Sequence, residues 1–445
     1  MKIVIAGAGE VGSHLAKLLS NEEQDITLVD SDATKLGVLD ANFNLMTITG
    51  DPTSFAALRE AKVDRCDLFI AVTPYETANI VACSIAKNLG AQLTVARIDS
   101  YDYMKPENFR HVKQMGVDKV IYPEYLAAQE IITALEYSWM RSRYELHEGQ
   151  IILAGIVLPE GAPIAGMQLK EFASTNHSFH VSAIRRNHET IIPGGGDRLL
   201  AGDVLFFTTT REHVDDLMAL TGQEDRKIRR VMIMGGGKLA MRLTNLAEGR
   251  FKFKILENDI DECHKLSRRC PTDVEIINGD ARDVETLLDS GITEMDAFVT
   301  LTPSSESNIL TCLTARELVD AKTVAEVENI QFIDQAEALN INLVINKKLL
   351  ASSAIFQLLL DADSSTSKCL ALADAEVAEM EVRKGSKITH APVKDLRLSR
   401  DMTLGGLIRD GKGMLIGGNT QILPGDHVLV FCLTGALRQV ERLFN

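Results

Sequence analysis

The sequence has few of the features that mark membrane, secreted or nucleic-acid-binding proteins. No apolar run approaches the roughly 20 residues that a membrane-spanning helix needs, and the apolar residues 2–9 are too few for a signal peptide. The net charge is −15 and Lys and Arg form no cluster, which argues against nucleic acid as a partner and against a membrane contact made by basic side chains. We therefore expect a cytoplasmic protein.

Cysteine pairs and metal-ligand motifs are also missing. The seven cysteines are scattered, odd in number and without a C-x-x-C pair, so we expect reduced, mostly buried thiols and no zinc site. They stand at positions 66, 83, 263, 270, 312, 369 and 432. His177, His180 and His188 lie in or near one loop, but a metal site there is the less favoured interpretation, and we predict no bound metal.

Motifs of common catalytic sites are absent as well. A dehydrogenase needs a proton-transfer group beside the nicotinamide, yet the ten histidines show no paired spacing and no Asp–His or Lys–Tyr signature. The motifs G-x-S-x-G, G-x-x-x-x-G-K-[ST] and H-E-x-x-H do not occur. We therefore predict that the chain is not an enzyme. An NAD-dependent oxidoreductase with a duplicated cofactor-binding domain is the alternative.

What the sequence does have is one glycine loop twice. A short apolar strand runs into G-x-G-x-x-G from Gly7, and a second such strand runs into G-x-G-x-x-A from Gly235. The similarity continues beyond the loops, because residues 50–98 align with residues 279–327 without a gap. This length indicates duplication of a whole module. A doubled ligand-binding module without a catalytic group is typical of a sensor.

The length of 445 residues exceeds what one hydrophobic core usually serves, so several domains are expected. Shorter matching segments follow each large repeat, for example Gly202-Asp203-Val204 and Gly425-Asp426-His427-Val428. Charged or polar stretches mark the middle and last junctions. The order is therefore large, small, large, small. The predicted domains are 1–148, 149–225, 226–370 and 371–445.

Apolar runs alternate with helical patterns in each large part. Near-continuous apolar strands between helices predict an α/β fold with a doubly wound parallel sheet of the Rossmann type. In the first large part, these strands are expected at 2–6, 26–30, 45–48, 67–72, 92–97 and 118–122. The small parts have short Val, Ile, Leu and Phe runs between Gly and Pro turns, which predict small α+β domains with mainly antiparallel strands.

The glycine loops have the chemistry of a dinucleotide site. Such glycines permit a tight turn, let the backbone approach a pyrophosphate and pack helix against strand, while the helix N-terminus offers free N–H groups. Asp30 ends the second strand about 20 residues after the first loop, and Glu257 takes that place in the second half. Both would accept hydrogen bonds from a ribose diol and repel a 2′-phosphate. We expect NAD(H) or adenine nucleotides rather than NADP(H).

Further polar residues follow the third and fourth strands. Asp51 and Asp280 stand where an adenine edge would lie, although a turn aspartate that caps the next helix fits nearly as well. Thr73 and Thr302 follow the fourth strand at the carboxyl edge of the sheet, where open sheets bind ligands.

The next helix and the fifth strand add more candidates. Asn79 and Asn308 lie one turn into the helix, where helix capping is the alternative to ligand contact. Arg97 ends the fifth strand and is predicted to face the phosphates of the ligand. Its counterpart in the second half is Glu326.

Charge also differs at the glycine loops. Glu10 and His14 in the first half become Lys238 and Arg242 in the second. One interpretation is drift on a solvated helix face. The functional hypothesis is a different ligand or affinity at each site, with the two cations favouring a more highly phosphorylated nucleotide such as ATP.

The segment from Tyr125 to Tyr144 has one apolar face at helical spacing. This helix either packs within its own domain or crosses to a neighbouring domain and forms a dimer interface. The residues of that face are Leu126, Ile131, Ile132, Leu135 and the single tryptophan, Trp139.

These motifs together resemble the Trk potassium uptake protein A family, cytoplasmic regulators built from two tandem RCK-type units. The resemblance covers essentially the whole chain and is most specific at the first twelve residues, at residues 28–30 and 94–97, and at the second loop. The small parts resemble the RCK C-terminal (TrkA-C) domain. The resemblance implies a homo-oligomer, a ring of four chains. By the same resemblance, we expect that ring to dock on the inner face of the plasma membrane, on a Trk-type potassium-translocating subunit, and to gate it in response to NAD(H) and ATP or ADP.

By position, the resemblance assigns nucleotide contacts in both halves. In the first half these are Gly7, Ala8, Gly9, Glu10 and Val11 for the pyrophosphate, Asp30 for the ribose, and Thr73 and Arg97 for the remainder. In the second half they are Gly235, Gly236, Gly237, Lys238, Leu239, Glu257 and Thr302. Ala240 and Glu326 depart from the family pattern. We therefore expect NAD(H) at the first site and either NAD(H) or ATP/ADP at the second. A regulator of another cation channel or of an antiporter is a further possibility.

Overall fold

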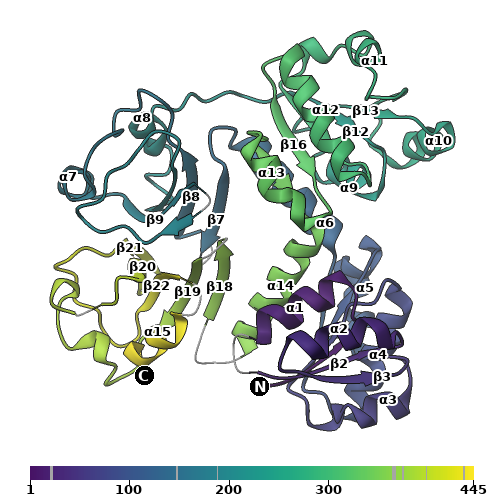
Figure 1. Ribbon diagram of the computed structural model, residues 1–445, viewed down its shortest axis with the longest axis horizontal. Coiled ribbons are helices and arrows are strands. Elements are labelled where there is room, and N and C mark those ends of the chain that lie inside the picture. Colours follow the sequence, from purple (N-terminus) through teal and green to yellow (C-terminus); the bar gives the residue numbers. More distant parts are fainter. Residues whose placement is uncertain are drawn as a thin grey trace.

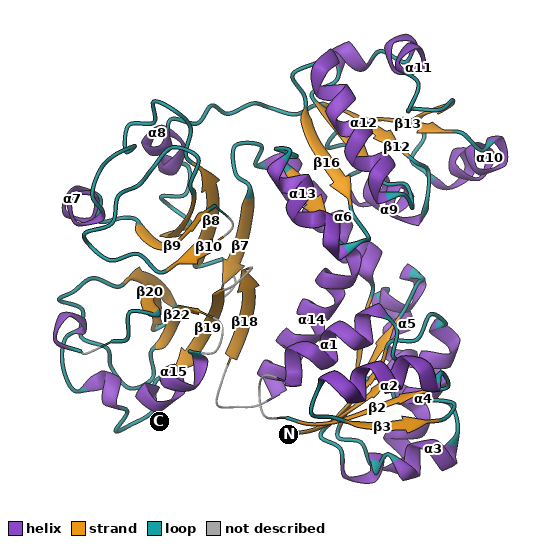
Figure 2. Ribbon diagram, in the orientation of Figure 1, coloured by secondary structure: helices purple, strands orange, loops and turns teal. Residues whose placement is uncertain are grey.

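The computed structural model arranges the chain as two large and two small domains (Figures 1 and 2). The backbone is described except at residues 21–23, 147–148, 188, 363–366, 373–374, 397, 434–435 and 445. Side chains are further left undescribed at 356–357, 359–362, 367–372, 376, 437–439 and 441. His188 and the side chain of Cys369, both considered above, lie outside the described set.

The first large domain is a six-stranded sheet in which every neighbouring pair is parallel. Its central strands are buried along nearly their whole length, as expected for a sheet covered by helices on both faces. In spatial order the strands are β3 (Met46–Thr49), β2 (Asp25–Asp30), β1 (Lys2–Ala6), β4 (Leu68–Ala71), β5 (Leu93–Arg97) and β6 (Lys119–Ile121). Its helices are α1 (Glu10–Ser20), α2 (Ala33–Asn42), α3 (Phe55–Glu60), α4 (Glu76–Leu89) and α5 (Pro106–Gln114).

The second large domain repeats this topology, which confirms the predicted duplication. Its strands, in the same spatial order, are β14 (Glu275–Asn278), β13 (Lys252–Glu257), β12 (Arg230–Met234), β15 (Ala297–Thr300), β16 (Lys322–Glu326) and β17 (Leu343–Ile345). Its helices are α9 (Lys238–Leu246), α10 (Ile260–Arg269), α11 (Val284–Asp289), α12 (Ser305–Leu318) and α13 (Ile333–Ala338). In both sheets the chain reverses its direction of progress between the first and fourth strands, and open sheets bind ligands at that crevice.

Each small domain has a five-stranded antiparallel sheet, as predicted. The first contains β10 (Glu189–Ile191), β9 (His180–Arg186), β11 (Val204–Thr210), β8 (Ile151–Val157) and β7 (Ser142–Leu146), with helices α7 (Leu169–Thr175) and α8 (Asp216–Thr221). The second contains β18 (Ser367–Leu372), β19 (Ala375–Glu381), β22 (His427–Leu433), β20 (Met402–Arg409) and β21 (Lys412–Leu415), with helix α15 (Leu437–Phe444).

Strand pairing corrects two of the predicted domain edges. β7 precedes the predicted edge at 148 but pairs with β8 in the small sheet. β18 spans the predicted edge at 370 and pairs with β19. The error arose because each strand comes within a few residues of a long helix, so the sequence alone does not show that it pairs with the following sheet.

The two small domains pack sheet against sheet (Figure 1). Buried side chains of both sheets share one apolar cluster that includes Leu153, Phe206, Val377 and Phe431. The contact is tight at Gly405, where an added Cβ would lie 2.8 Å from Thr208 Oγ1. The two halves of the chain therefore associate through their small domains.

The helix α6 (Pro123–Glu136) follows the first sheet in sequence but packs on the second large domain. Its apolar face lies against α9 and the second sheet, and its C-terminal end is fixed by Lys322 Nζ, which donates to the carbonyl oxygens of Ala134 and Ser138 at 2.8 and 3.0 Å. The α6 side chains buried there are Ala127, Ala128, Ile131, Ile132 and Leu135. The prediction that this helix crosses to a neighbouring domain is confirmed for Ile131, Ile132 and Leu135, and that neighbour is the other half of the same chain. The other two predicted residues stay in the first half: Leu126 packs on the first large domain, and Trp139 lies in the core of the first small domain. The dimer interface stays a prediction.

The helix α14 (Lys347–Ala362) makes the reciprocal crossing. It lies beside α1 (Figure 1), and its Ala351 and Ile355 are buried in the core of the first large domain. Ser352 Oγ donates to the carbonyl oxygen of Val11, within the first glycine motif, at 3.5 Å. The exchange of α6 and α14 joins the halves and brings each glycine loop close to residues of the other half.

Candidate nucleotide-binding sites

The two glycine loops adopt the same turn at the switch points of their sheets. Gly7 and Gly235 have φ of +113° and +97°, which side chains rarely adopt, and an added Cβ would approach the fourth-strand segment at 3.0 Å in each half. Gly7 N donates to Val29 O, and Gly235 N donates to Leu256 O. These glycines fix the turn itself.

The second glycine of each loop serves a different purpose. No heavy atom lies within 4 Å of the Cβ position of Gly9 or of Gly237. Space is therefore left beside the first turns of α1 and α9, where a phosphate would meet the helix N-termini.

The third position of the motif differs between the halves. A Cβ on Gly12 would lie 1.9 Å from Gly7 O, whereas the second half accommodates Ala240, fully buried against α6.

Asp30 and Glu257 occupy equivalent places at the ends of β2 and β13. Asp30 accepts hydrogen bonds from Ala8 N at 2.6 Å and Asp32 N at 2.8 Å. Glu257 accepts them from Gly236 N at 2.7 Å and Asp259 N at 2.9 Å. Each carboxylate oxygen keeps a lone pair for a ribose hydroxyl.

Glu257 is longer than its counterpart Asp30, and the loop residue beside it is correspondingly smaller. A Cβ at Gly236 would lie 3.1 Å from Glu257 Oε2 and 2.3 Å from Leu266 Cδ1, so the second half needs glycine where the first has Ala8. The loop and the acidic residue thus differ together between the halves.

Asn79 and Asn308 do not face the ligand space, which corrects our prediction. Both are fully buried. Asn79 Oδ1 accepts from Thr73 N and Thr73 Oγ1, and its Nδ2 donates to the carbonyl oxygens of Thr73 and Arg97. Asn308 makes the equivalent four hydrogen bonds, to the backbone and hydroxyl of Thr302 and to the carbonyl oxygen of Glu326. Neither caps the start of its helix, where Tyr75 and Ser304 stand. The asparagines hold the fourth and fifth strand ends together beneath the site.

Asp51 and Asp280 are engaged in local turns. Asp51 Oδ1 accepts from Thr53 N and Thr53 Oγ1, and these bonds lower the pKa of Asp51. Asp280 pairs with Arg282 at 2.6 Å and accepts from Arg282 N, which lowers the pKa of Asp280. The caps of the following helices are Ser54 and Asp283. Both aspartates therefore stabilise a turn, as the alternative interpretation stated, but neither caps the following helix.

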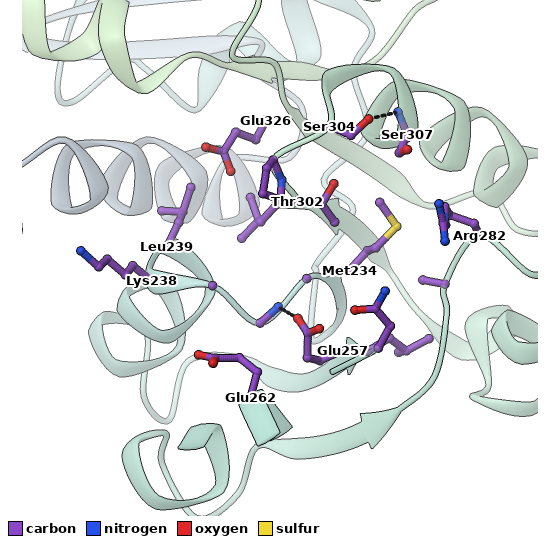
Figure 3. A pocket seen from close by; sticks show the side chains of 18 of the residues that line it. Met234, Lys238, Leu239, Glu257, Glu262, Arg282, Thr302, Ser304, Ser307 and Glu326 are labelled. Carbon is purple, nitrogen blue, oxygen red and sulfur yellow. Dashed lines mark hydrogen bonds between the residues drawn. The ribbon is translucent and has the colours of Figure 1, made fainter. Parts of the chain in front are cut away.

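A cavity of about 680 Å³ opens at the second glycine loop (Figure 3). It is large enough for a nucleotide. The predicted residues that line it come from all four strand ends around the switch point: Gly235, Gly236, Gly237, Lys238, Leu239, Glu257, Asp280 and Thr302. Figure 3 shows the bond from the loop backbone to Glu257, with Thr302 and Glu326 on the opposite wall.

Five further cavity residues carry charge that the sequence did not indicate as part of this site. Glu262 and Arg282 belong to the second large domain's own helix and turn, and the others are Glu124 from the start of α6, Glu328 after β16, and Lys347 from the start of α14. Lys347 Nζ lies 2.7 Å from Glu326 Oε1 and 3.2 Å from Glu328 Oε1. Burial raises the pKa of Glu326 to about 7, despite the neighbouring lysine. Glu124 was missed because it reaches the second site from the first half of the chain.

Arg97 lies at the end of β5, as predicted. Its guanidinium pairs weakly with Asp99 at 3.4 Å, and its Nε is buried without a hydrogen-bond partner. A buried donor without a partner costs stability, so a ligand oxygen here would be favourable.

Arg242 does not belong to the phosphate wall. Its guanidinium stacks on the ring of Tyr101 at 4.1 Å and lies 5.5 Å from that of Tyr122, both in the first large domain. Of the two cations that we expected to select a more highly phosphorylated ligand, only Lys238 therefore remains a candidate. Arg242 holds the two halves together through cation–π contacts.

Cysteines and histidines form no reactive cluster among the described residues. The described free cysteines are buried, apart from the partly exposed Cys270, and burial raises the pKa of Cys66 to about 12. No group of three metal-ligating side chains gathers within the described parts of the chain. No helix in those parts has both the length and the apolarity to cross a bilayer.

Comparison with known proteins assigns all four domains. The TrkA-N domain model matches residues 3–123 and 231–347, and the TrkA-C domain model matches residues 153–222 and 377–445. The chain is 29% identical to the Trk system potassium uptake protein TrkA of Halomonas elongata, with 100% of this chain and 99% of the relative covered. It is 28% identical to that of Haemophilus influenzae with the same coverage. Among solved structures, the GsuK channel bound to NAD aligns with 100% of this chain and 78% of its own, at a TM-score of 0.63 and 16% identity.

Proposed function

The chain belongs to the TrkA family, with two TrkA-N and two TrkA-C domains, and we propose that it is a nucleotide-binding regulatory subunit of a potassium-translocating membrane protein. The observation that carries the proposal is the duplicated site. Both halves present a glycine loop open at its second glycine, an acidic residue at the ribose position and a threonine on the opposite wall. The names of the full-length relatives support the role in potassium uptake.

The first site takes NAD(H), and the second takes NAD(H) or ATP/ADP. At the first site, Gly7, Ala8, Gly9, Glu10 and Val11 hold the pyrophosphate, with Asp30, Thr73 and Arg97 around the remainder. Asp51 lies at the adenine end. At the second site, Lys238 adds a cation beside the phosphates and Glu257 binds the ribose. The GsuK channel bound to NAD supports a dinucleotide by likeness of fold alone.

The chain acts without catalysis, as one subunit of a ring of four, on the inner face of the plasma membrane. A nucleotide can shift the ring between two states only by the difference of its affinity for them. The two halves of the chain are joined by the exchanged helices and the paired small sheets. A change in one large domain is therefore carried directly to the other half.

Calorimetry on the intact chain tests the sites. We expect NADH to bind wild type, and Asp30→Ala to remove binding at the first site only. Glu257→Ala should remove binding of ADP or NADH at the second site only. Asp261→Ala, an exposed acid on α10 outside the cavity, is the matched control and should bind as wild type does. Absence of binding of NAD⁺, NADH, ATP and ADP to wild type would refute the proposed function. Turnover of NADH with a hydroxy acid or aldehyde would instead favour the oxidoreductase.

A further inference from the structure

The charge differences between the two halves are complementary across the interface between the halves. Glu10, beside the first glycine loop, pairs with Lys348 of α14. Lys238, at the equivalent place beside the second loop, lies 3.8 Å from Asp99 of the first half. Each loop therefore has an oppositely charged residue of the other half next to it. This pairing explains the reversal from Glu10 to Lys238 better than drift on a solvated face.

The pairs continue from each loop to the wall of the other site. Lys348 Nζ lies 2.8 Å from Glu328 Oε2, Glu328 Oε1 lies 3.2 Å from Lys347 Nζ, and Lys347 lies 2.7 Å from Glu326 on the second wall. The first ion-pair chain is thus Glu10–Lys348–Glu328–Lys347–Glu326, with charges that alternate along it.

The second ion-pair chain is shorter and runs the other way. Lys238 at the second loop contacts Asp99, and Asp99 contacts Arg97 on the wall of the first site. Asp99 follows β5 as Glu328 follows β16, so the two chains occupy equivalent places in the duplicated fold.

Most members of both chains are shielded from water. The side chains of Asp99, Glu328, Lys347 and Lys348 are all between 23% and 25% exposed, and Glu326 is 4% exposed. Burial alone would lower the pKa of Lys348, yet its bonds to Glu10 and Glu328 raise it. Glu10 and Lys238, beside the loops, are 65% and 60% exposed. The inner pairs are screened less by salt than these surface residues, so a change at one inner pair is felt by the next.

We propose that these two ion-pair chains couple the nucleotide sites, so that an anionic nucleotide at one site weakens binding at the other. The inference rests on the proposed function and states how its two sites communicate.

The sign follows from competition for the cations. A phosphate at the first site attracts Arg97 and Lys348 away from Asp99 and Glu328. Asp99 then holds Lys238 more strongly, which withdraws this cation from phosphates at the second site. Both ion-pair chains therefore weaken binding at the second site when the first is occupied. Thermodynamic linkage requires that occupation of the second site weakens binding at the first by the same factor.

The same competition leaves the second wall more negative. Glu328, released from Lys348, competes for Lys347. Glu326 then loses part of the positive charge of Lys347 that offsets its own negative charge, at the place where an anionic ligand would lie. Couplings of this kind typically change affinity about fivefold or more, and we expect about five- to tenfold weaker binding here.

The test measures NADH affinity by fluorescence with and without saturating ADP. In Glu257→Ala, whose second site is lost, any effect of ADP on NADH affinity can come only from competition at the first site. In the intact chain it also occupies the second site, so the drop in NADH affinity should be about five- to tenfold larger. The additional drop should fall to less than twofold in Lys348→Met combined with Asp99→Asn. It should persist in Lys348→Arg, which keeps the charge.

Lys17→Met, which removes an exposed lysine at the end of α1, is the matched control and should keep the additional drop. Heat-induced unfolding of every variant shows whether it is folded. Equal drops in the intact chain and Glu257→Ala, tighter NADH binding with ADP, or full coupling in the folded double variant would each overturn the inference. All three outcomes leave nucleotide binding intact, so they are distinct from failure of the proposed function.

Discussion

Replacing Ile131 by alanine should destabilise the half of the protein to which this residue does not belong in sequence. Ile131 lies on α6 in the first half, yet it is fully buried in the core of the second large domain. Truncation of a buried isoleucine typically costs about 2–5 kcal/mol, because apolar contacts are lost and a cavity remains.

Hydrogen exchange of backbone amides locates this loss. With about 1.4 kcal/mol for each tenfold change, a cost of about 2 kcal/mol accelerates exchange on the order of 30-fold where opening exposes the amides. We expect acceleration in β12, β13 and α9. The matched control is Ile80→Ala on α4, which is buried in the first domain's own core. It should accelerate exchange in the first sheet. Loss of protection confined to the first large domain in Ile131→Ala would refute the exchanged-helix arrangement.

Four further predictions follow from single side chains. Ile355→Ala on α14 should mirror the effect of Ile131→Ala and weaken protection in the first large domain; unchanged protection there would contradict its burial against α1. Asn79→Ala should lower the melting temperature, because it leaves buried backbone groups of Thr73 without partners; a variant as stable as wild type but deficient in NADH binding would mean that Asn79 contacts the ligand after all. Gly12→Ala should weaken NADH binding at the first site and leave the second unchanged, since its Cβ would meet Gly7 O; calorimetry with equal affinities at the first site would refute this. NAD⁺ affinity at the second site should fall as pH rises through about 7, because Glu326 ionises beside an anionic ligand. Glu326→Gln should remove this pH dependence. A pH dependence that survives the substitution would contradict the placement of Glu326 beside the ligand.

Much of the fold was predictable from local sequence. The alternation of apolar runs and helices located the strands of the first sheet, and the gapless match between the halves indicated the duplication. Asp30 and Glu257 were correctly placed beside the glycine loops, because their distance from the loop is fixed by the strand–helix–strand unit that separates them. These features depend on contacts within one domain.

The features that the sequence left open depend on contacts between domains. The apolar face of α6 shows that the helix is buried, but two similar sheets offer equivalent surfaces, and periodicity does not choose between them. The roles of Arg242 and Lys348 depend on the same exchange, because each contacts the other half. Asn79 was misjudged for another reason. A polar residue near a ligand site has the same pattern whether it binds the ligand or holds the backbone beneath it.

Potassium flux tests the central claim most directly. The Trk-type membrane subunit from the same cells would be reconstituted in liposomes with the purified chain, and rubidium uptake would be measured with and without NADH, ATP and ADP. The account predicts that nucleotides change uptake only when the chain is present, and that Asp30→Ala and Glu257→Ala each remove part of the response. Uptake that ignores nucleotides while both sites are shown to be occupied would contradict it.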